Sequence, residues 1–473
     1  MLPGKVVVLD VGKTSAKLSL WNEEGELAAE RSRYNARVEE NGSRWLDTEG
    51  IEAWASAVLA EFGAMGSITA IVPVAHGAAA ALVRNGRLAS PVRDYEDPIP
   101  TGLRESYDAQ RDPFELTGSP ALPGGLNLGV QLHRVEHEHH APLTQDTRIV
   151  PWPQYWAWRL SGVMASEVTS LGCHTDLWRP CEQGPSHLAR KRGWWESMAP
   201  LVRADVVLGE LTDEWVERTG LGKQVRVLCG IHDSNAALHG VRAFPTCVDQ
   251  EVSVLSTGTW FVAMRGVLNS ASVDIASIPE ERDCLVNVDC ESKPVPSARF
   301  MGGRELELIG VGEGINEPID MQVLSEVVTE GIMVLPGWVA DVGPYSSSGG
   351  RWSRDPGTRK QRIAAAGLYA ALMADTCLEL IGARGTLVVE GRFASMEVFV
   401  RGLATIRRDA QIFVNHSEES SVACGALRLV VPTLRRADTL VRVAPLDMDL
   451  ADYREHWRDQ AEEYSLNCAR RVI

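Results

Sequence analysis

The sequence lacks long hydrophobic runs and paired cysteines, and each absence excludes a class of protein. No stretch reaches the ~18 consecutive apolar residues of a membrane-spanning helix. The first residues lead directly into a short apolar run, without the charged and apolar regions of a signal peptide. The nine cysteines are scattered, odd in number and never spaced C-x-x-C. We therefore expect a cytoplasmic protein without disulfides or a membrane anchor.

Basic residues are too few to attract polyanions. The 47 Lys and Arg residues face 63 Asp and Glu residues, which gives a formal net charge of -16. Such a field repels phosphate backbones and anionic lipid surfaces, so neither nucleic acid nor a membrane is an expected partner. Hydrophobic residues make up 45% of the 473 residues, enough for sizeable cores. At roughly 150 residues per domain, this length favours two large domains.

The chain is predicted to open as an antiparallel meander instead of alternating strands and helices. Residues 5–9, 16–21 and 26–38 have the apolar or alternating pattern of strands, with turn residues between them. Residues 49–63 carry apolar side chains at helical spacing, which predicts an amphipathic helix.

Two short segments, about half the chain apart, share one design. Residues 6–20 and 252–265 each read as an apolar strand, a polar residue, a glycine-containing turn with a hydroxyl residue, and a second strand. A repeat at this distance suggests duplicated domains that each open with a strand–turn–strand unit. Two such turns facing each other would hold a polyphosphate from both sides. Because the repeat is short and degenerate, chance similarity between two hairpins is the alternative.

The first of these turns, residues 10–15, collects groups that bind metal and phosphate. It is not a P-loop, because that motif requires glycine where Val7 lies in mid-strand. It offers instead a carboxylate from Asp10, a glycine that allows close backbone approach, two hydroxyls and a cation, which suit Mg²⁺ and phosphate oxygens. The second turn, residues 256–259, offers similar donors without the carboxylate. Taken singly, each is better explained as an ordinary polar hairpin turn.

A third segment places an aspartate just after a strand. Residues 225–230 are predicted to be a strand that ends at Gly230, and Asp233 begins a helix of small residues. The simplest interpretation is that Asp233 caps this helix. The functional alternative is a general base that takes the proton of an attacking hydroxyl during phosphoryl transfer.

Taken together, these segments resemble the FGGY family of carbohydrate kinases, within the actin-like ATPase superfamily. Asp10 to Lys17 is similar to the family's first phosphate motif, D-x-G-T-[ST]-S-x-[KR], with Lys13 where threonine or glutamine is usual. Residues 230–233 resemble the G-x-x-D that carries the family's catalytic aspartate.

Further stretches follow in the family's order, between Val6 and about Val430. Residues 75–78 are similar to the M-H-G-A stretch of xylulokinases, whose histidine lies at the sugar. Residues 256–260 resemble the second phosphate motif, in a form closest to fuculokinases and rhamnulokinases. Residues 424–427 are similar to the family's L-G-A-A helix start near the adenine.

Other stretches depart from the family pattern. Residues 390–395 replace the G-G-G of the adenosine motif and keep Gly391, which leaves the nucleotide preference open. Gln154 lies where the K-D-Y-L stretch commonly has aspartate, which leaves the sugar open. Trp45 begins a stretch that resembles the W-x-[EQ]-D near the sugar pocket, although a tryptophan before a helix is equally typical of a core or a hydrophobic staple.

The resemblance implies an α/β fold of two duplicated ribonuclease-H-like domains with a central cleft. Residues 1–243 would form the N-terminal domain with the sugar and phosphate side, residues 244–440 the C-terminal nucleotide domain, and residues 441–473 a tail. The implied activity is ATP- and Mg²⁺-dependent phosphorylation of a small sugar, such as L-fuculose, L-rhamnulose or xylulose, or of a polyol. The alternative is a non-catalytic sensor of sugar or nucleotide. Whether the protein is a homodimer is left open.

The resemblance also assigns roles to single residues. Asp233 would be the general base and Asp10 the metal ligand. The nucleotide would be bound by Gly12, Lys13, Thr14, Ser15, Lys17, Thr257, Gly258, Thr259, Gly391 and Gly425. The sugar would be bound by Trp45, His76, Gly77, Gln154, Asp233 and Trp260.

Overall fold

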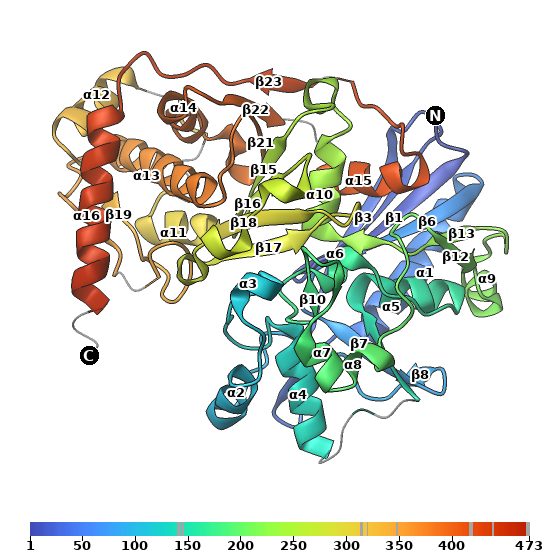
Figure 1. Ribbon diagram of the computed structural model, residues 1–473. Coiled ribbons are helices and arrows are strands. Elements are labelled where there is room, and N and C mark those ends of the chain that lie inside the picture. Colours follow the sequence, from blue (N-terminus) through green and yellow to red (C-terminus); the bar gives the residue numbers. More distant parts are fainter. Residues whose placement is uncertain are drawn as a thin grey trace. The chain divides into compact units, whose positions relative to one another are not determined.

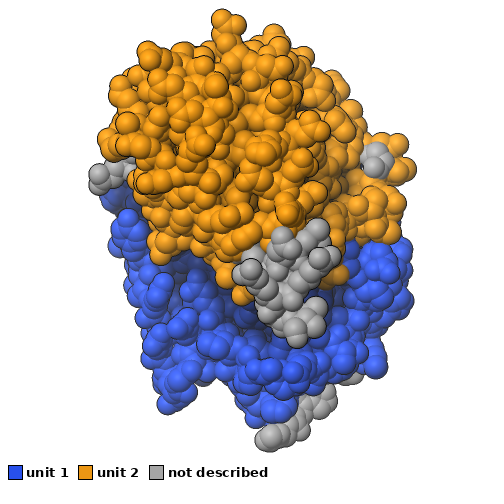
Figure 2. All heavy atoms as spheres, turned by 90° about the vertical axis from the view of Figure 1, so that its left-hand side faces the viewer, with its two compact units in different colours: residues 1–243, 286–294, 419–435 blue, residues 244–285, 295–418, 436–473 orange. Residues whose placement is uncertain are grey.

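The computed structural model describes residues 1–139, 143, 146–312, 316–318, 320–346, 349–415, 420–437 and 439–469. The chain divides into two compact units, coloured separately in Figure 2. Unit 1 comprises residues 1–243, 286–294 and 419–435, and unit 2 comprises residues 244–285, 295–418 and 436–473. Residues 470–473, the end of the predicted tail, lie outside the described residues.

Unit 1 is built on a seven-stranded sheet (Figure 1) in which β1 lies at the centre. β1 is antiparallel to β2 and parallel to β6, and β2 is antiparallel to β3. The strands, in spatial order, are β12 (Val207–Glu210), β13 (Arg226–Leu228), β6 (Ile68–Ala75), β1 (Lys5–Val11), β2 (Ser15–Trp21) and β3 (Leu27–Tyr34), with β14 (Ile231–His232) also paired to β6.

Alternate residues of β1 point into two different cores, one on each face of the sheet. Val7, Leu9 and Val11 pack with α1 (Thr48–Ala64) and α5 (Trp152–Ser161). Val6 and Val8 belong to the other core, with α10 (Asp233–Val241) and α15 (Ser421–Val430). Because both faces are covered, β1 reads as a nearly continuous apolar run.

α15 packs on α10 through glycine, which explains why residues 419–435 group with unit 1. A side chain at Gly240 would come within 1.9 Å of the Ser421 carbonyl oxygen, and one at Gly425 within 1.9 Å of the Ala236 carbonyl oxygen. Only glycine allows this backbone approach. Contact density therefore assigns residues 286–294 and 419–435 to unit 1, although both fall inside the range 244–440 of the predicted second domain.

Unit 2 is built on a second seven-stranded sheet with the same central arrangement (Figure 1). β15 is antiparallel to β16 and parallel to β21, as β1 is to β2 and β6. The predicted α/β fold of two duplicated domains is therefore confirmed, and the repeat is not a chance similarity of hairpins. The strands, in spatial order, are β17 (Cys284–Val288), β18 (Pro294–Phe300), β16 (Phe261–Gly266), β15 (Val252–Thr257), β21 (Thr386–Gly391), β22 (Gln411–Asn415) and β23 (Leu440–Arg442).

The remaining elements surround the two sheets. In unit 1 they are β4 (Arg37–Glu40), β5 (Ser43–Leu46), β7 (Ala80–Arg84), β8 (Arg87–Leu88), α2 (Thr101–Asp108), α3 (Phe114–Thr117), α4 (Leu128–His139), β9 (Thr147–Pro151), α6 (Val168–Leu171), β10 (Trp178–Arg179), β11 (Gly184–Pro185), α7 (His187–Lys191), α8 (Trp194–Ser197) and α9 (Asp213–Thr219). In unit 2 they are α11 (Gly302–Ile309), α12 (Met321–Thr329), β19 (Val334–Leu335), β20 (Arg351–Trp352), α13 (Arg359–Leu380), α14 (Glu397–Ile406) and α16 (Ala451–Ala469).

α13 is the one helix, among the described residues, that is long and apolar enough to cross a membrane. Of its most apolar window, 89% is buried inside the protein, as in the core helix of a soluble domain. Its Asp375 is fully buried and pairs with Arg407 at 3.0 Å. Length and composition alone are therefore weak evidence for a membrane span here.

Candidate active site

The turn between β1 and β2 is fixed by two hydrogen bonds from Asn35. The Asn35 amide donates to the Gly12 carbonyl at 2.8 Å, and the Asn35 N–H donates to the Thr14 carbonyl at 2.8 Å. The side chains of Thr14 and Ser15 are exposed. The hydroxyl residues of the turn are therefore exposed to solvent, while the carbonyls of Gly12 and Thr14 accept hydrogen bonds from Asn35.

Asp10 lies at the end of β1, opposite Lys17 in the β1–β2 register. Burial, followed by repulsion from Asp233, raises the pKa of Asp10 to about 7, and the positive charge of Lys17 opposes this shift. Glu30, which lies 3.3 Å from the Lys17 ammonium, adds to the repulsion. The carboxyl ends of β1, β6 and β14 thus gather carboxylates and one cation, as expected where parallel strands end at one edge of a sheet.

The ring of His232 lies next to Asp233 and is held by a hydrogen bond from Asn235. The Asn235 amide is 3.1 Å from His232 Nδ1, so Nδ1 accepts and the ring proton lies on Nε2. Nε2 is 3.2 Å from Asp233 Oδ1 and 3.3 Å from Cys173 Sγ. Burial lowers the pKa of His232, which keeps the ring neutral with this tautomer. Nε2 is therefore the ring nitrogen nearest the Asp233 carboxylate, and its hydrogen-bond partner is Cys173 Sγ.

Asp233 does not make the hydrogen bond of a helix cap. It is the first residue of α10, and its carboxylate accepts the N–H of the next residue, Ser234, at 2.5 Å. A capping side chain instead accepts from the N–H two or three residues along. The side chain of Asp233 is 29% exposed, so one side of the carboxylate is open to a ligand.

A second layer of buried groups supports the His232–Asp233 pair. Thr169 Oγ1 accepts the His232 N–H at 3.0 Å, and the Thr169 hydroxyl donates to Glu167. Burial raises the pKa of Glu167 to about 8. Gln154 is fully buried, and its amide donates to the carbonyls of Cys229 at 3.3 Å and Gly230 at 3.2 Å. Gln154 thus contacts the backbone before Asp233 and does not line the cavity described next.

A small cavity of about 130 Å³ opens beside the first turn, entirely within unit 1. Two buried polar atoms of its lining residues, Trp152 Nε1 and Asn35 Oδ1, have no partner among the described residues, so a polar ligand or water would satisfy them. The lining residues are Val11, Gly12, Lys13, Thr14, Tyr34, Asn35, Ala36, Arg37, Leu46, Asp47, Ile51, His76, Asp94, Glu96 and Trp152.

His76 presents an acceptor to this cavity. Its Nδ1 is 2.7 Å from the Gly77 carbonyl oxygen and must donate to it, which leaves Nε2 as an acceptor in the neutral ring. Burial lowers the pKa of His76 and favours this neutral form. The ring packs edge-on against Tyr95 at 5.7 Å and lies 6.1 Å from Trp152, between centroids. The ring of His76 is therefore fixed in the cavity wall with Nε2 as its acceptor nitrogen.

The backbone around His76 is fixed by close packing. A side chain at Gly77 would come within 2.6 Å of Cys173 Sγ and 3.1 Å of His232 Nε2, which explains the glycine. The Gln131 amide donates to the Ala78 carbonyl at 2.7 Å and to the Gly125 carbonyl at 2.6 Å. The histidine loop is thereby tied to the proline- and glycine-rich loop 118–127.

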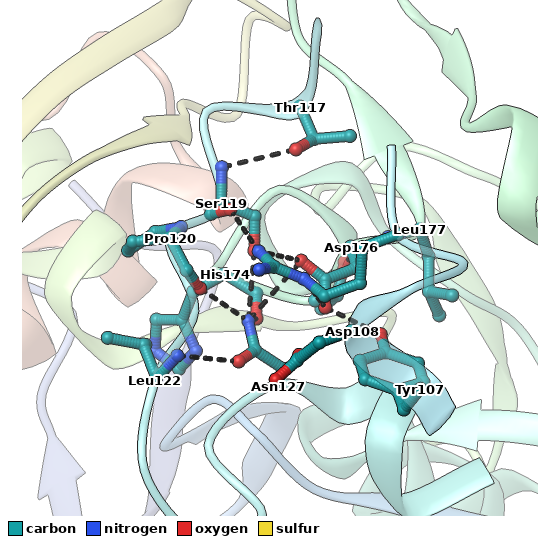
Figure 3. Close-up of polar contacts among 12 residues, drawn as sticks. Tyr107, Asp108, Thr117, Ser119, Pro120, Leu122, Asn127, His174, Asp176 and Leu177 are labelled. Atoms are coloured by element: carbon teal, nitrogen blue, oxygen red, sulfur yellow. Dashed lines mark hydrogen bonds and ion pairs between the residues drawn. The ribbon is translucent and has the colours of Figure 1, made fainter. Parts of the chain in front are cut away.

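Loop 118–127 is in turn anchored by a buried polar network around Asp176 (Figure 3). The Tyr107 hydroxyl donates to Asp176 Oδ2 at 2.5 Å, and Arg111 pairs with Asp176 Oδ1 at 3.1 Å. Asn127 donates to the His174 carbonyl at 3.2 Å and accepts the Leu122 N–H at 2.9 Å. These groups satisfy one another, so the network is structural and serves to hold the loop behind the cavity.

In unit 2 the corresponding turn follows β15, and its polar groups are largely engaged within the unit. The Thr257 hydroxyl donates to the Glu390 carbonyl at 2.6 Å and accepts the Phe393 N–H at 3.2 Å. The Gly258 N–H donates to the Trp260 carbonyl at 3.0 Å. Thr259 is exposed. Thr259 is thus the hydroxyl of this turn that faces solvent.

Glycines allow other segments to approach the second turn. Gly391 has a positive φ of 94°, and a side chain there would come within 2.4 Å of the Thr257 carbonyl oxygen. A side chain at Gly303, in the first turn of α11, would come within 2.1 Å of the Gly258 carbonyl oxygen. The retained Gly391 is therefore explained by backbone geometry.

Comparison with known proteins identifies the family. A solved carbohydrate kinase from Novosphingobium aromaticivorans is 46% identical, with a TM-score of 0.90 and coverage of 98% of this chain and 99% of that chain. The family model described as "Carbohydrate kinase FGGY, C-terminal domain" matches residues 249–438. The chain belongs to the FGGY family of carbohydrate kinases. The predicted resemblance is confirmed, and the alternative of a non-catalytic sensor does not agree with it.

More distant FGGY kinases share the fold over nearly the whole chain. A xylulose kinase from Rhodospirillum rubrum is 16% identical, with a TM-score of 0.76 and 98% coverage of both chains. A glycerol kinase from Plasmodium falciparum, solved with ADP, is 12% identical, with a TM-score of 0.73 and 98% coverage of both chains. No curated protein matches the chain significantly.

The predicted site residues of unit 1 fall into three groups: those around the first turn, those in contact with buried backbone, and one that lies away from the cavity. Asp10, Lys17, His76 and Asp233 gather around the first turn and its cavity. Gln154 and Gly425 make backbone contacts inside unit 1, as described above. Trp45 does not line the cavity, and its ring lies 4.6 Å beneath the Arg93 guanidinium.

Trp260 was predicted to bind the sugar, whereas several residues of the cavity were not predicted at all. Trp260, in unit 2, is covered by the Arg299 guanidinium at 4.9 Å from its ring. The sequence motifs gave no signal for Asn35, Asp94 or Trp152, which line the cavity of this kinase. Asn35 and Asp94 lie in loops, and Trp152 is the first residue of α5. Trp152 directly precedes the stretch 153–156 in which Gln154 was predicted to bind the sugar.

Proposed function

We propose that this kinase transfers the γ-phosphate of ATP to a hydroxyl of a small uncharged sugar, with Asp233 as the general base. The acceptor would be a ketose, such as L-fuculose, L-rhamnulose or xylulose, or a polyol. The observation that carries the proposal is the position of the Asp233 carboxylate, 3.2 Å from His232 Nε2, where its charge acts on both Asp10 and His76. One carboxylate thus lies near both the proposed metal ligand and the proposed sugar ligand.

The residues around the first turn fit a magnesium ion. Asp10 offers a hard oxygen ligand beside Asp233, and a cation there would relieve the repulsion between the two carboxylates. The described residues contain no cluster of three or more metal-binding side chains. Mg²⁺ commonly binds one or two carboxylates together with substrate phosphates and water, so Asp10 is sufficient. When bound, the ion would neutralise charge on the phosphates.

Each residue then has one task. His76 Nε2 accepts a hydrogen bond from a sugar hydroxyl, and the exposed side of Asp233 takes the proton of the attacking hydroxyl. The hydroxyls of Thr14, Ser15 and Thr259 donate to phosphate oxygens. Such donors suit phosphoryl transfer, which depends on positioning and charge neutralisation.

A panel of ketoses, polyols and sugar acids tests the proposal. Release of ADP is measured with each compound, with and without Mg²⁺, and with GTP and CTP in place of ATP. We expect ADP release that requires both a sugar and Mg²⁺. Nucleotide binding without sugar-dependent ADP release for any compound would contradict it.

A further inference from the structure

Lys13 lies in the wall of the unit 1 cavity, and its charge is already paired there. Its ammonium group donates to Asp94 Oδ2, lies 3.8 Å from Glu96 Oε2 and sits 4.9 Å from the centre of the Tyr95 ring. The Lys13 side chain is 21% exposed and that of Asp94 is 5% exposed. A nucleotide phosphate would have to draw Lys13 away from this largely buried ion pair.

The two lysines of the first motif act on different groups. Lys17 lies opposite Asp10, and it is the cation that opposes the burial-driven rise of the Asp10 pKa. Lys13 adds instead to the effect of burial, which lowers the pKa of His76. Both Lys13 and His76 line the cavity, whereas Lys17 does not. Lys17 therefore belongs with the proposed metal ligand and Lys13 with the proposed sugar ligand.

The carboxylate partner of Lys13 is held in place by backbone hydrogen bonds. The Asp94 N–H donates to the Arg44 carbonyl at 3.1 Å, and Asp94 Oδ1 accepts the Glu96 N–H at 2.8 Å. The Tyr95 carbonyl accepts the Gly125 N–H at 2.7 Å. Residues 94–96 thus form a turn tied to β5 and to loop 118–127. A pair held in this way is ordered before a ligand arrives, which lowers the entropic cost of binding.

We propose that Lys13 and Asp94 form a specificity-determining pair that binds two adjacent hydroxyl groups of the acceptor sugar. An ammonium group has three N–H donors, of which Asp94 takes one, and a carboxylate has about four lone-pair positions. One sugar hydroxyl accepts from Lys13 and its neighbour donates to Asp94, while the ion pair stays intact. Lys13 is then a sugar ligand and not a phosphate ligand. This inference rests on the proposed function of unit 1.

The charges beside Lys13 select against a sugar acid bound at the pair. Lys13 is neutralised by Asp94, Glu96 adds a negative charge nearby, and His76 is neutral. Of the other charged lining residues, Asp47 pairs with Arg33 at 2.7 Å and Arg37 is exposed. An acidic sugar would bring its carboxylate beside Asp94 and Glu96, and like charges at this distance repel. The acceptor class is therefore an uncharged polyhydroxy compound with two adjacent hydroxyls.

The test compares Lys13→Met with Lys17→Met in the full-length enzyme, using the sugar that the wild type phosphorylates best. Loss of a hydrogen bond to a charged group should raise the KM for the sugar about ten- to hundredfold in Lys13→Met, with the KM for ATP within about twofold. Lys17→Met should show the opposite pattern. Calorimetric titration with the sugar alone gives the same comparison without turnover.

Deoxygenated sugars locate the two hydroxyls. The wild type should have a higher KM for analogues that lack either hydroxyl than for the complete sugar. Lys13→Met should lose this difference for one of the two hydroxyls. Asp94→Asn should lose it for the adjacent hydroxyl. If a single variant leaves a buried charge alone and fails to fold, the Lys13→Met/Asp94→Asn double variant removes both charges, and it should lose discrimination at both positions.

Two outcomes would overturn the inference. A raised KM for ATP with an unchanged KM for the sugar in Lys13→Met would make Lys13 a phosphate ligand. Unchanged values for both would make the ion pair merely structural. Failure of the proposed function would appear in the wild type, as absent sugar-dependent ADP release, and the inference would fall with it. Failure of the inference alone appears only in the variants.

Discussion

The two units carry the same hairpin but surround it with different chemistry. In unit 1 the residue two positions before the turn glycine is Asp10, whose charge interacts with Asp233. In unit 2 the corresponding residue is Ser256, whose hydroxyl donates to Glu390 Oε1 at 3.2 Å. The Thr257 hydroxyl is occupied by backbone groups as well. The two hairpins thus share their strand pairing, while the carboxylate at the end of the first strand occurs in unit 1 and a serine takes its place in unit 2.

The largest expected effect tests whether the acid–base chemistry belongs to unit 1. Asp233→Asn keeps the size of the side chain and its hydrogen bond to Ser234, but the amide cannot take a proton. We expect kcat to fall about 10²- to 10⁴-fold, the usual contribution of a general base, with the melting temperature and the KM for ATP unchanged.

The control for Asp233→Asn lies in the hairpin of unit 2. Ser256→Ala removes the hydroxyl that corresponds to Asp10 in that hairpin, and it should reduce kcat far less than Asp233→Asn does. An Asp233→Asn enzyme that melts like the wild type and retains nearly normal turnover would show that the base lies elsewhere. A protein that instead loses several kcal/mol of stability would make Asp233 structural.

The second prediction compares Gly391, at the end of β21 beside the second turn, with Gly12 in the first turn. Gly391→Ala puts a side chain on a residue with a positive φ of 94°, within 2.4 Å of the Thr257 carbonyl. Strained backbone of this kind costs about 1–3 kcal/mol, and the close contact adds to it, so the unfolding midpoint should fall by several degrees.

Gly12→Ala, in the turn of unit 1, is the matched variant. Its nearest new contact, with the Ser15 carbonyl, is 3.1 Å, and Gly12 does not have a positive φ. We expect a smaller loss, below about 1 kcal/mol. Equal losses for the two glycines in thermal unfolding would contradict the difference between the turns.

A smaller effect is expected from His232, for which we find no counterpart described in unit 2. His232→Ala removes the imidazole that lies 3.2 Å from Asp233 Oδ1 and should lower kcat about tenfold, with little change in the KM for the sugar. His232→Gln can place an amide donor near the position of Nε2 and should restore most of the activity. Equal activity of the two variants would mean that His232 does not position the carboxylate.

Local sequence patterns predicted the elements that depend on neighbouring residues. The strand over 5–9 and the helix over 49–63 lie within β1 and α1, and the paired hairpins revealed the duplication. The strand predicted over 26–38 is instead two strands, β3 and β4, because residues 35 and 36 leave the sheet and Asn35 turns back to hold the first turn. Its contact with Gly12 joins residues that are 23 positions apart, and the alternation of apolar residues along a strand cannot predict such a contact.

The cavity was less predictable, because its wall comes from segments brought together by folding. Asp94 follows no motif, and its contact with Lys13 joins residues that are 81 positions apart. Motif position alone assigned Lys13 to phosphate and Gln154 to sugar. Their observed partners, a carboxylate in the cavity wall and two buried carbonyls, depend on packing that the sequence does not display.

The smallest expected effect is a pH dependence that Asp10 should have and Ser256 should lack. Burial and Asp233 raise the pKa of Asp10 from 3.8 to about 7 in the folded protein, so the folded state binds the proton more tightly than the unfolded state. The stabilisation from this proton is complete below the unfolded value and is lost as the pH rises through about 7. Asp10→Asn mimics the protonated group at every pH.

We therefore expect metal-free Asp10→Asn to match the wild type only below about pH 4, and to become increasingly more stable than the wild type between about pH 5 and pH 8, because the wild type loses the stabilisation from its buried proton over this range. Urea unfolding with a chelator present measures the difference, and Ser256→Ala should show no such trend. Mg²⁺ with ADP should stabilise the wild type at about pH 8 more than Asp10→Asn, because the ionised carboxylate is the form that binds a cation. A gap between wild type and Asp10→Asn that stays constant from pH 5 to pH 8 would mean that Asp10 ionises normally, and the carboxylate pair would then no longer distinguish the first turn from the second.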